Sequence, residues 1–419
     1  MKQGNLEQFD VVVIGGGAAG LMAAISAARA GAKVVILEHK EKTGKKILST
    51  GNGKCNYTNE KQDIICYRGE HPDFAMSVFK QFGFSETVTF FEEIGVTPKV
   101  KNGYYYPASE QATAVLEVLR LEANYLRVKE VCECEIKQIN PADNSFFLET
   151  SVGGYTGKSV IFATGLLAAP KSGSDGTSFP YIERLGHHFI DVVPALVPLQ
   201  GKQAFFKQIA GIRAEIRADL YVGNAKIASE YGELQLTDYG VSGIPVFQLS
   251  RYATKALKVG QKVYMILDFM PHTSMEEAIL LFERRLHKAE QKKTICECFV
   301  GLFNKKLAEV FIKEAGISLG DSPKKVTDEQ IVHLAETVKG LRVDITGSKS
   351  FEQAQVCAGG VDTEEISAQT MESKIVPGVY FAGELVDIDG MCGGYNLQWA
   401  WSSGYIAGLH AAQRSSVEQ

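Results

Sequence analysis

Three glycines near the start of the chain, Gly15, Gly17 and Gly20, have the spacing that brings a backbone up against a pyrophosphate. In this Gly-x-Gly-x-x-Gly pattern the first glycine permits a sharp turn and the second lets the backbone approach phosphate oxygens. The third lets a helix pack closely on a strand. Ala19 lies between them, and Glu38 follows further on with a carboxylate that can accept hydrogen bonds from ribose hydroxyls. These residues together predict a dinucleotide site.

The residues around the glycines predict the elements that position them. Residues 11–14 are Val-Val-Val-Ile, a β-branched run typical of a parallel strand buried on both faces. Residues 18–30 are mostly small and predict a helix whose first N–H groups, including that of Ala19, point at the phosphates. Residues 33–37 predict a second strand that ends at Glu38. A glycine pattern alone is weak evidence for a dinucleotide site. A strand, a glycine turn, a helix and a second strand that ends at an acidic residue, in this order, make the prediction specific.

The apolar stretch 11–28 raises two other interpretations. A membrane segment is disfavoured because four of the six residues 15–20 are glycine. A signal peptide is disfavoured because Asp10 stands where a basic flank is expected and no small-residue cleavage signal follows. We therefore expect no membrane partner.

The composition is that of an ordinary globular protein. A chain of 419 residues suffices for two or three domains, and its net charge of −5 supplies no electrostatic footprint for nucleic acid. Its eight cysteines form no C-x-x-C pair and no His/Cys cluster with zinc spacing. We expect reduced thiols in a cytoplasmic protein with no metal site and no nucleic-acid partner.

Residues 39–59 form a basic, glycine-rich loop with two possible uses. In flavoprotein disulfide reductases the corresponding loop carries a redox-active cysteine pair, so Cys55 could be a thiol beside a flavin; however, Cys66 lies eleven residues on, too far for a tight couple. In the alternative, which we prefer, the glycines wrap a cofactor while Lys46 and Ser49 offset and hydrogen-bond its phosphate charge.

Further along, apolar periodicity predicts helical structure within 72–95 and a helix at 112–126, and strands at 128–139, 145–150 and 157–163. The last strand runs into Ala163-Thr164-Gly165, a suitable exit from a dinucleotide-binding sheet. Three tyrosines, residues 104–106, precede Pro107 and indicate an extended segment that covers a core edge or, less favoured, lines a substrate cavity.

From residue 193 the pattern changes to short strands and turns, and residues 273–340 then predict charged, amphipathic helices. The chain returns at 379–384 with a short strand that ends in Gly383 and Glu384. Gly394 and its neighbours precede a last helix that begins near Asn396 and contains small residues for close packing on the sheet. We expect this helix N-terminus to face a flavin ring where negative charge accumulates on reduction.

Over nearly its whole length the chain resembles the BaiN-like bacterial flavoproteins. The motifs that carry the resemblance are GGGAAGLMAA at 15–24, TGKKILSTGNGKCNYTN at 43–59, ATG at 163–165, GGV at 359–361 and GELVDIDGMCGGYNLQWAWSSGYIAG at 383–408. The resemblance implies an α/β fold: a Rossmann-like FAD-binding domain in two segments, an inserted β-barrel-like domain and a small helical domain. We expect the first segment at 1–192, the β-rich insertion at 193–272, the helical subdomain at 273–340 and the return segment at 341–419.

The resemblance also implies non-covalent FAD and the residues that bind it. Glycines 15, 17 and 20 would face the pyrophosphate and Glu38 the adenosine ribose. The other residues carried over are Lys46, Ser49 and Gly53 in the flavin loop, Thr164 and Gly165 at the adenine side, Gly383, Glu384 and Asp387 by the ribityl chain and pyrophosphate, and Asn396 and Leu397 at the flavin ring. The chain departs from the family pattern at Tyr104, at Cys357 and in the turn 173–180, where substrate choice could be made.

Three functions follow from these features. The first is an FAD-dependent oxidoreductase that passes electrons from NAD(P)H to an unsaturated or carbonyl-conjugated small molecule. The second is an oxidase that transfers hydride from a small amine or alcohol to oxygen, and the third is a non-catalytic FAD-binding protein such as an RNA-modification partner. We prefer the first.

Since no second Gly-x-Gly-x-x-Gly follows a strand after residue 165, NAD(P)H would visit transiently, in a cleft between the FAD domain and the insertion near residues 104–106, Cys357 and Cys392. The chemistry would belong to the flavin, so catalytic residues and oligomeric state stay open.

Overall fold

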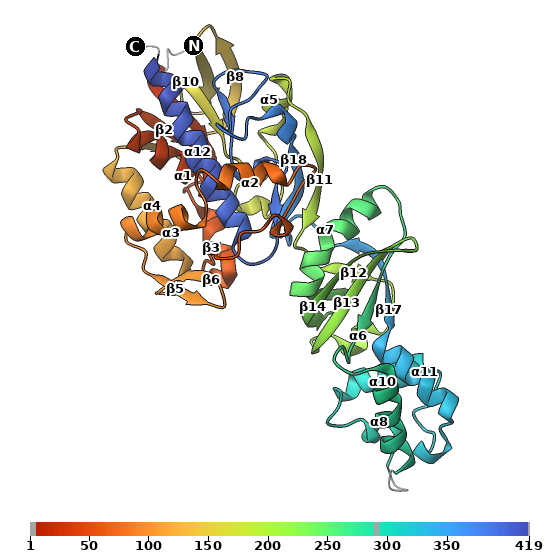
Figure 1. Cartoon of the computed structure of the whole chain (residues 1–419). Helices are drawn as coiled ribbons and strands as arrows, with labels where there is room; N and C mark the ends of the chain where they lie inside the picture. Colours follow the sequence, from red (N-terminus) through yellow and green to blue (C-terminus); the bar gives the residue numbers. More distant parts are fainter. Residues whose placement is uncertain (1–5, 289–292, 418–419) are drawn as a thin grey trace. The chain divides into compact units, whose positions relative to one another are not determined.

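The computed structural model of the chain describes residues 6–288 and 293–417 (Figure 1). The chain divides into two compact units: the first combines residues 1–193 with 351–419, and the second consists of residues 194–350. The four-segment domain boundaries drawn from the sequence stay a prediction. The α/β class, with a Rossmann-like domain and an inserted barrel, is confirmed.

The first unit is built on a seven-stranded sheet with the order β7-β2-β1-β10-β9-β8, to which β19 adds beside β10. Strands β1 (Leu6–Ile14), β2 (Val34–Leu37), β7 (Lys129–Val131), β10 (Gly154–Phe162) and β19 (Val379–Phe381) pair in parallel. β9 (Ser145–Thr150) and β8 (Ile136–Ala142) extend the other side as an antiparallel hairpin. The parallel strands meet with their carboxyl ends at one edge, where α/β sheets bind ligands.

One predicted strand is wrong in its extent. The pattern at 128–139 predicts a single strand, whereas β7 and β8 are separate strands of this sheet. Between them Glu133 takes a positive φ of 53°, and its N–H donates to the carbonyl of Lys40. This turn redirects the chain from one end of the sheet to the other, which hydrophobic periodicity does not reveal.

Two helices that are far apart in sequence pack together in the first unit. α1 (Ala18–Arg29) follows the glycine turn, and α12 (Tyr395–Val417) is the last helix. A Cβ on Gly404 or Gly408 of α12 would overlap the carbonyl oxygens of Ala19 and Ala23 in α1. The small residues of α12, expected to permit close packing on the sheet, therefore permit contact with α1. α12 also reaches the sheet, where Ser159 of β10 donates to the carbonyl of Ala411.

Shorter elements complete the first unit. The helical pattern at 72–95 forms two helices, α2 (Asp73–Phe79) and α3 (Phe84–Glu93), which are separated at Gly83. The N–H of Gly83 donates a hydrogen bond to the carboxylate of Glu86. The helix α4 (Ala112–Tyr125) matches its prediction. β6 (Tyr104–Pro107), between β3 (Thr58–Asn59) and β5 (Pro98–Lys101), is the tyrosine segment. The Tyr105 ring packs edge-on against Tyr57 and Phe84, as expected for a segment that covers a core edge. The remaining pairs are β4 (Tyr67–Arg68) with β20 (Asp389–Gly390) and β11 (Phe189–Ala195) with β18 (Val356–Val361).

The second unit contains a closed six-stranded barrel and a group of helices. The barrel order is β12 (Leu199–Gly201), β15 (Gly240–Gly243), β14 (Ala225–Leu236), β13 (Arg213–Val222), β16 (Val263–Asp268) and β17 (Leu341–Ser348). α6 (Phe206–Ile209) and α7 (Ile244–Lys258) lie between barrel strands in sequence. α8 (Met275–His287), α9 (Ile295–Cys298), α10 (Lys305–Glu314) and α11 (Asp328–Lys339) fall between β16 and β17.

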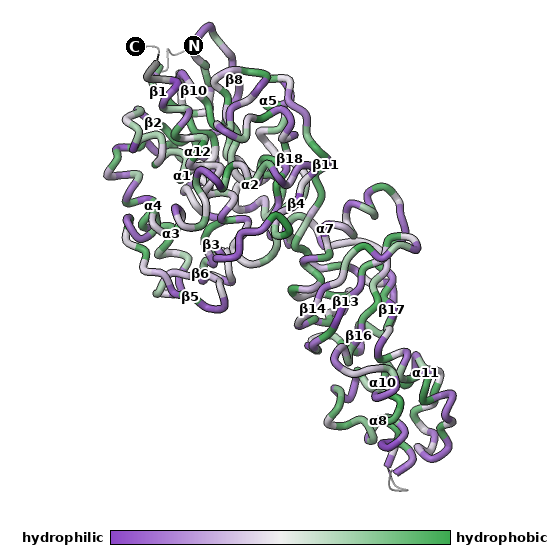
Figure 2. Tube along the Cα trace, viewed as in Figure 1, coloured by the Kyte–Doolittle hydropathy of each residue, from purple (hydrophilic) through white to green (hydrophobic). Residues whose placement is uncertain are grey.

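Helices α8 to α11 contain both apolar and polar residues along their length (Figure 2) and bury most of the apolar ones in a hydrophobic core that includes barrel residues. Ser274 and Thr327 cap α8 and α11 through reciprocal hydrogen bonds with Glu277 and Gln330. Throughout the described part of the chain, we find no helix with both the length and the apolar character needed to cross a membrane.

Candidate cofactor site

A cavity of about 640 Å³ lies in the first unit, and every residue that lines it belongs to that unit. It is bounded by the carboxyl ends of β1, β2 and β10, by the chain just after β19, and by the first residues of α1 and α12. This is the edge of the sheet at which doubly wound α/β folds bind nucleotides. Its volume lies near the middle of the range, roughly 300–1,000 Å³, that small-molecule sites occupy.

The glycine turn forms one wall of this cavity. Gly15 has a φ of +95°, and a Cβ there would lie 2.7 Å from the carbonyl oxygen of Ala163. A Cβ on Gly20 would overlap the carbonyl oxygen of Gly15, so both residues must be glycine for the turn to close. A Cβ on Gly17 would have no atom within 4 Å. Packing within the protein does not require that glycine, and its open side at the start of α1 leaves room for a phosphate, as FAD binding requires.

Glu38 at the end of β2 is held rigidly beneath the turn. Its Oε2 accepts a hydrogen bond of 2.8 Å from the N–H of Gly16, and its Oε1 accepts one of 2.8 Å from the N–H of Lys40. The residue is 7% exposed and lines the cavity. Two backbone donors therefore fix the carboxylate that a ribose would meet.

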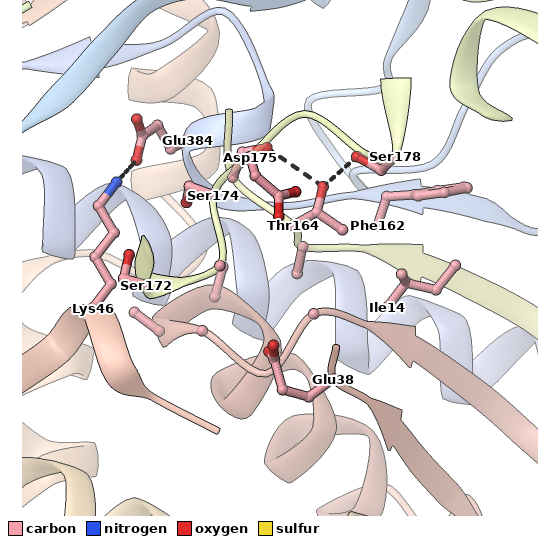
Figure 3. A pocket seen from close by; sticks show the side chains of 18 of the residues that line it. Ile14, Glu38, Lys46, Phe162, Thr164, Ser172, Ser174, Asp175, Ser178 and Glu384 are labelled. Carbon is pink, nitrogen blue, oxygen red and sulfur yellow. Dashed lines mark hydrogen bonds and ion pairs between the residues drawn. The ribbon is translucent and has the colours of Figure 1, made fainter. Parts of the chain in front are cut away.

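A polar loop at 172–178 faces this end of the cavity (Figure 3). The hydroxyl oxygens of Thr164 and Ser178 are 2.7 Å apart, and His39 Nε2 lies 3.0 Å from Asp175 Oδ2. The sequence analysis named this turn as a place where the substrate could be selected. In the structure the turn lines the cavity that also contains Glu38. Short runs of Ser and Gly are common in turns, so the sequence contained no signal for this position.

On another wall, Lys46 and Glu384 form an ion pair, with Lys46 Nζ 2.6 Å from Glu384 Oε2. The second carboxylate oxygen of Glu384 accepts a hydrogen bond of 2.9 Å from the backbone N–H of Cys357. Figure 3 shows the two side chains pointing toward each other from separate segments. The charge of Lys46, expected to offset phosphate, is thus directed at a carboxylate of the protein.

The structure brings most of the candidate binding residues into one cavity. Those that line it are Gly15, Gly17, Ala19, Glu38, Lys46, Thr164, Gly165, Gly383, Glu384, Asn396 and Leu397. Gly20, Ser49, Gly53, Asp387 and Gly394 do not line it. Lining residues that the sequence analysis missed include His39, Lys40, Thr50, Cys134, Ile136, Ile139 and Tyr181.

Three of the residues outside the cavity have structural contacts that explain their identity. The buried Asp387 accepts a hydrogen bond of 2.8 Å from the N–H of Glu70. Ser49 is exposed and donates to the carbonyl of Lys46. Gly394 has a φ of +94°, and a Cβ there would lie 2.8 Å from the carbonyl oxygen of Thr58. These residues support the shape of the loops around the cavity.

All eight cysteines are free thiols, as expected. Cys55 is fully buried, and burial raises its pKa to about 12. Burial also raises the pKa of Cys357, whose backbone N–H contacts Glu384. Neither side chain is a thiolate near neutral pH, which is the reactive form of cysteine.

Comparison with known proteins places the chain in a family. The family described as "HI0933-like protein Rossmann domain" matches residues 9–410. The chain is 41% identical to a 3-dehydro-bile acid delta(4,6)-reductase of Clostridium scindens, over 96% of this chain and 98% of that protein. It is 30% identical to a ribosomal RNA dihydrouridine synthase of Haemophilus influenzae, again over 96% of this chain and 98% of the relative.

A solved structure agrees with the fold. The 3-ketosteroid delta1-dehydrogenase of Sterolibacterium denitrificans, in complex with 1,4-androstadiene-3,17-dione, aligns with a TM-score of 0.50 at 11% identity and covers 97% of this chain and 100% of that one. At that identity the likeness shows the architecture alone. The family match and the relatives nevertheless agree with the cavity, and the chain belongs to the HI0933-like family as an oxidoreductase whose Rossmann domain binds FAD.

Proposed function

We propose that the protein reduces a carbon–carbon double bond conjugated to a carbonyl group, with electrons that come from NADPH or NADH through FAD. The observation that carries this proposal is the cavity itself, which joins an open phosphate cradle at Gly17 to a fixed ribose acceptor at Glu38. Three of the charged side chains that line it, Glu38, Lys46 and Glu384, are committed to protein partners. The chain therefore binds and orients, and FAD when bound supplies the hydride chemistry.

In this proposal the first N–H groups of α1 receive the pyrophosphate, and Glu38 holds the adenosine ribose with Thr164 and Gly165 near the adenine. Gly383 and Glu384 lie along the ribityl and pyrophosphate part, and Asn396 and Leu397 approach the flavin ring. The start of α12 then presents its N-terminal dipole to negative charge at the ring. Asn396 keeps that start in place, because its amide exchanges two hydrogen bonds with the backbone of Gly390.

The substrate class rests on what two relatives have in common. A 3-dehydro-bile acid with delta(4,6) unsaturation has double bonds conjugated to a carbonyl at position 3. Formation of dihydrouridine from uridine likewise saturates a double bond conjugated to a ring carbonyl. A small conjugated ketone is our first choice of acceptor, because the relative named for it is the more similar of the two and the chain has a net charge of −5.

A uridine within RNA is the second candidate acceptor, favoured by the 30% identity to a ribosomal RNA dihydrouridine synthase. The absence of nucleic acid among the predicted partners therefore stays a prediction. Comparing turnover on a 3-oxo-4,6-diene steroid with turnover on ribosomal RNA transcripts would choose between the two. Uridine reduction in RNA together with no turnover of the steroid would overturn our first choice.

Anaerobic stopped-flow tests the electron donor. Bleaching of the oxidised flavin band by NADPH or NADH, faster than turnover, is expected. If neither nucleotide bleaches the band but a small amine or alcohol does, and air rapidly restores it, the protein is an oxidase. If no donor reduces the flavin, the protein is a non-catalytic FAD carrier.

A further inference from the structure

The Lys46–Glu384 ion pair connects three segments that are distant in sequence. Lys46 lies in the short 3-10 helix η1 (Lys45–Gly53) of the loop 39–59, Glu384 follows β19, and Cys357 belongs to β18. The ammonium and the carboxylate are 2.6 Å apart, and their side chains are only 25% and 18% exposed. Both line the cofactor cavity, so the pair links two of its walls.

The carboxylate is oriented independently of the lysine. Glu384 Oε1 accepts the hydrogen bond from the Cys357 N–H, a backbone group of a fully buried strand, while Oε2 faces Lys46. A partly buried ion pair whose acid is already fixed loses less side-chain entropy on forming than a surface pair between two mobile chains. This geometry makes the Lys46–Glu384 contact stronger than an ordinary surface bridge.

Lys46 lies near the start of η1, a 3-10 helix that is kinked toward its end. Thr50, Gly51 and Asn52 leave helical geometry, with φ values of +55° at Gly51 and +53° at Asn52. The N–H of Gly44 donates to the carbonyl of Gly16 and the side chain of Ile47 is buried, so the start of the loop is anchored. A second ion pair, from Lys54 to Glu110, joins the end of the loop on the exposed surface, away from the cavity.

We propose that Lys46 and Glu384 form a clasp that holds residues 45–53 against bound FAD and sets how fast FAD is released. This inference rests on the FAD site proposed above. Both residues are positioning residues, because the clasp restrains the loop and takes no part in electron transfer. Release of FAD along this wall requires the loop to move, and loop movement requires the clasp to break.

The test is the rate of FAD dissociation, followed by the rise of flavin fluorescence after dilution of the loaded protein. We expect Lys46→Met and Glu384→Gln each to accelerate release by about tenfold. The double variant should be no faster than the faster single variant, because both changes break one contact. Lys46→Arg should stay within about twofold of the original rate, since it retains the charge.

The matched control is the exposed pair of the same loop. Lys54→Met and Glu110→Gln should leave the release rate unchanged. If Lys46→Met released FAD no faster than Lys54→Met, or if the effects of Lys46→Met and Glu384→Gln multiplied in the double variant, the clasp would be refuted. Circular dichroism and melting temperature of each variant separate these outcomes from misfolding, and Glu384→Gln preserves the acceptor for Cys357.

A measurement without cofactor separates the clasp from the FAD proposal. Amide hydrogen exchange in residues 45–53 of the FAD-free protein should be faster in Lys46→Met than in Lys54→Met. A protein that binds no FAD but shows this difference would contradict the cofactor site and support the clasp. FAD-loaded protein with equal exchange in the two variants would overturn the clasp and leave the cofactor site standing.

Discussion

At the scale of single residues, Glu38 is the proposed acceptor for the ribose of FAD. Its two oxygens accept from the N–H groups of Gly16 and Lys40, so the carboxylate is already aimed before a ligand arrives. We predict that Glu38→Ala weakens FAD binding by about 1.5–3 kcal/mol, the value of a hydrogen bond to a charged acceptor. Fluorescence titration of apoprotein with FAD measures this change.

The control for Glu38→Ala is Glu41→Ala. Glu41 pairs with Lys45 near the same loop, but its carboxylate is exposed and does not line the cavity. Equal FAD affinity in the two variants would show that Glu38 has no special role. Loss of folding in Glu38→Ala, seen as a lower melting temperature without FAD, would mean that its two backbone contacts are its main function.

Cys55 is predicted to stay reduced and unreactive throughout turnover. Burial raises its pKa to about 12, so below that pH the thiol stays protonated and is a poor nucleophile. In folded protein at pH 8 iodoacetamide should leave Cys55 unmodified and label the half-buried Cys392 faster, with Cys55 becoming reactive only on unfolding. Mass spectrometry of the digested protein distinguishes the two sites.

A loss of two free thiols on substrate oxidation, together with a Cys55→Ser variant that keeps its flavin but loses turnover, would contradict this prediction. The missing partner at short spacing was visible in the sequence. The burial that suppresses the thiolate was not, because it depends on the side chains that surround Cys55 in the fold.

The residues of the site differ in how far the sequence could predict them. Gly15, Gly17 and Glu38 belong to one local unit, whose spacing implies its geometry. The Lys46–Glu384 contact joins positions 338 residues apart, and no local pattern marks it. Asp387 was carried over from a motif, and Gly394 was expected to let the last helix approach the flavin, yet both support loops outside the cavity. A motif identifies residues that matter but does not separate those that touch a ligand from those that hold a loop.

At the scale of elements, two positions at the start of α1, Gly17 and Gly20, are glycine for different physical reasons. A Cβ on Gly17 meets no protein atom within 4 Å, whereas one on Gly20 overlaps the carbonyl of Gly15. We predict that Gly17→Ala preserves the melting temperature of the apoprotein but weakens FAD binding, because the methyl group fills the phosphate cradle. Gly20→Ala should lower the melting temperature even without FAD.

Calorimetry of the apoproteins and FAD titration of both variants check this pair. Unchanged FAD affinity in Gly17→Ala would show that the phosphates lie elsewhere. An unchanged melting temperature in Gly20→Ala would show that the turn relaxes without cost.

The contact between α1 and α12 connects the two ends of the chain. A Cβ on Gly408 would overlap the backbone carbonyl of Ala23, which cannot move as a flexible side chain can. We predict that Gly408→Ala destabilises the protein by about 1–3 kcal/mol, the usual cost of overpacking. Ala400→Gly, at another α12 position, is a control for helix propensity and should cost about 1 kcal/mol or less. Denaturant unfolding of the two variants supplies both values.

The helices show which elements are predictable from sequence. α1 and α4 lie within one or two residues of their predicted bounds. α1 is a run of small residues placed between a glycine turn and a strand, and α4 has a continuous apolar stripe. The pattern at 72–95 has the same period but is divided at Gly83, and the 128–139 pattern is divided by the turn at Glu133. Periodicity measures burial of one face, and it persists across a break when both pieces bury that face.

At the scale of the whole molecule, all residues that line the cofactor cavity belong to the first unit, although they come from both ends of the chain. The second unit has its own hydrophobic core, formed by the barrel and the helices α8 to α11. Separate cores are expected of segments that fold as units. FAD binding should therefore be a property of the first unit alone.

We predict that a protein in which residues 194–350 are replaced by a short Gly/Ser linker folds and binds FAD with an affinity within about tenfold of the full chain. The sheet, the glycine turn, the Lys46–Glu384 pair and the α1–α12 contact all remain in this variant. Turnover should be lost if the second unit shapes the substrate site, while reduction of the flavin by NADPH or NADH would show that the donor needs the first unit only. Flavin absorbance, circular dichroism and stopped-flow on the same preparation measure the three properties. A folded variant that no longer binds FAD would contradict the prediction and show that the second unit is required to form or to close the cofactor site.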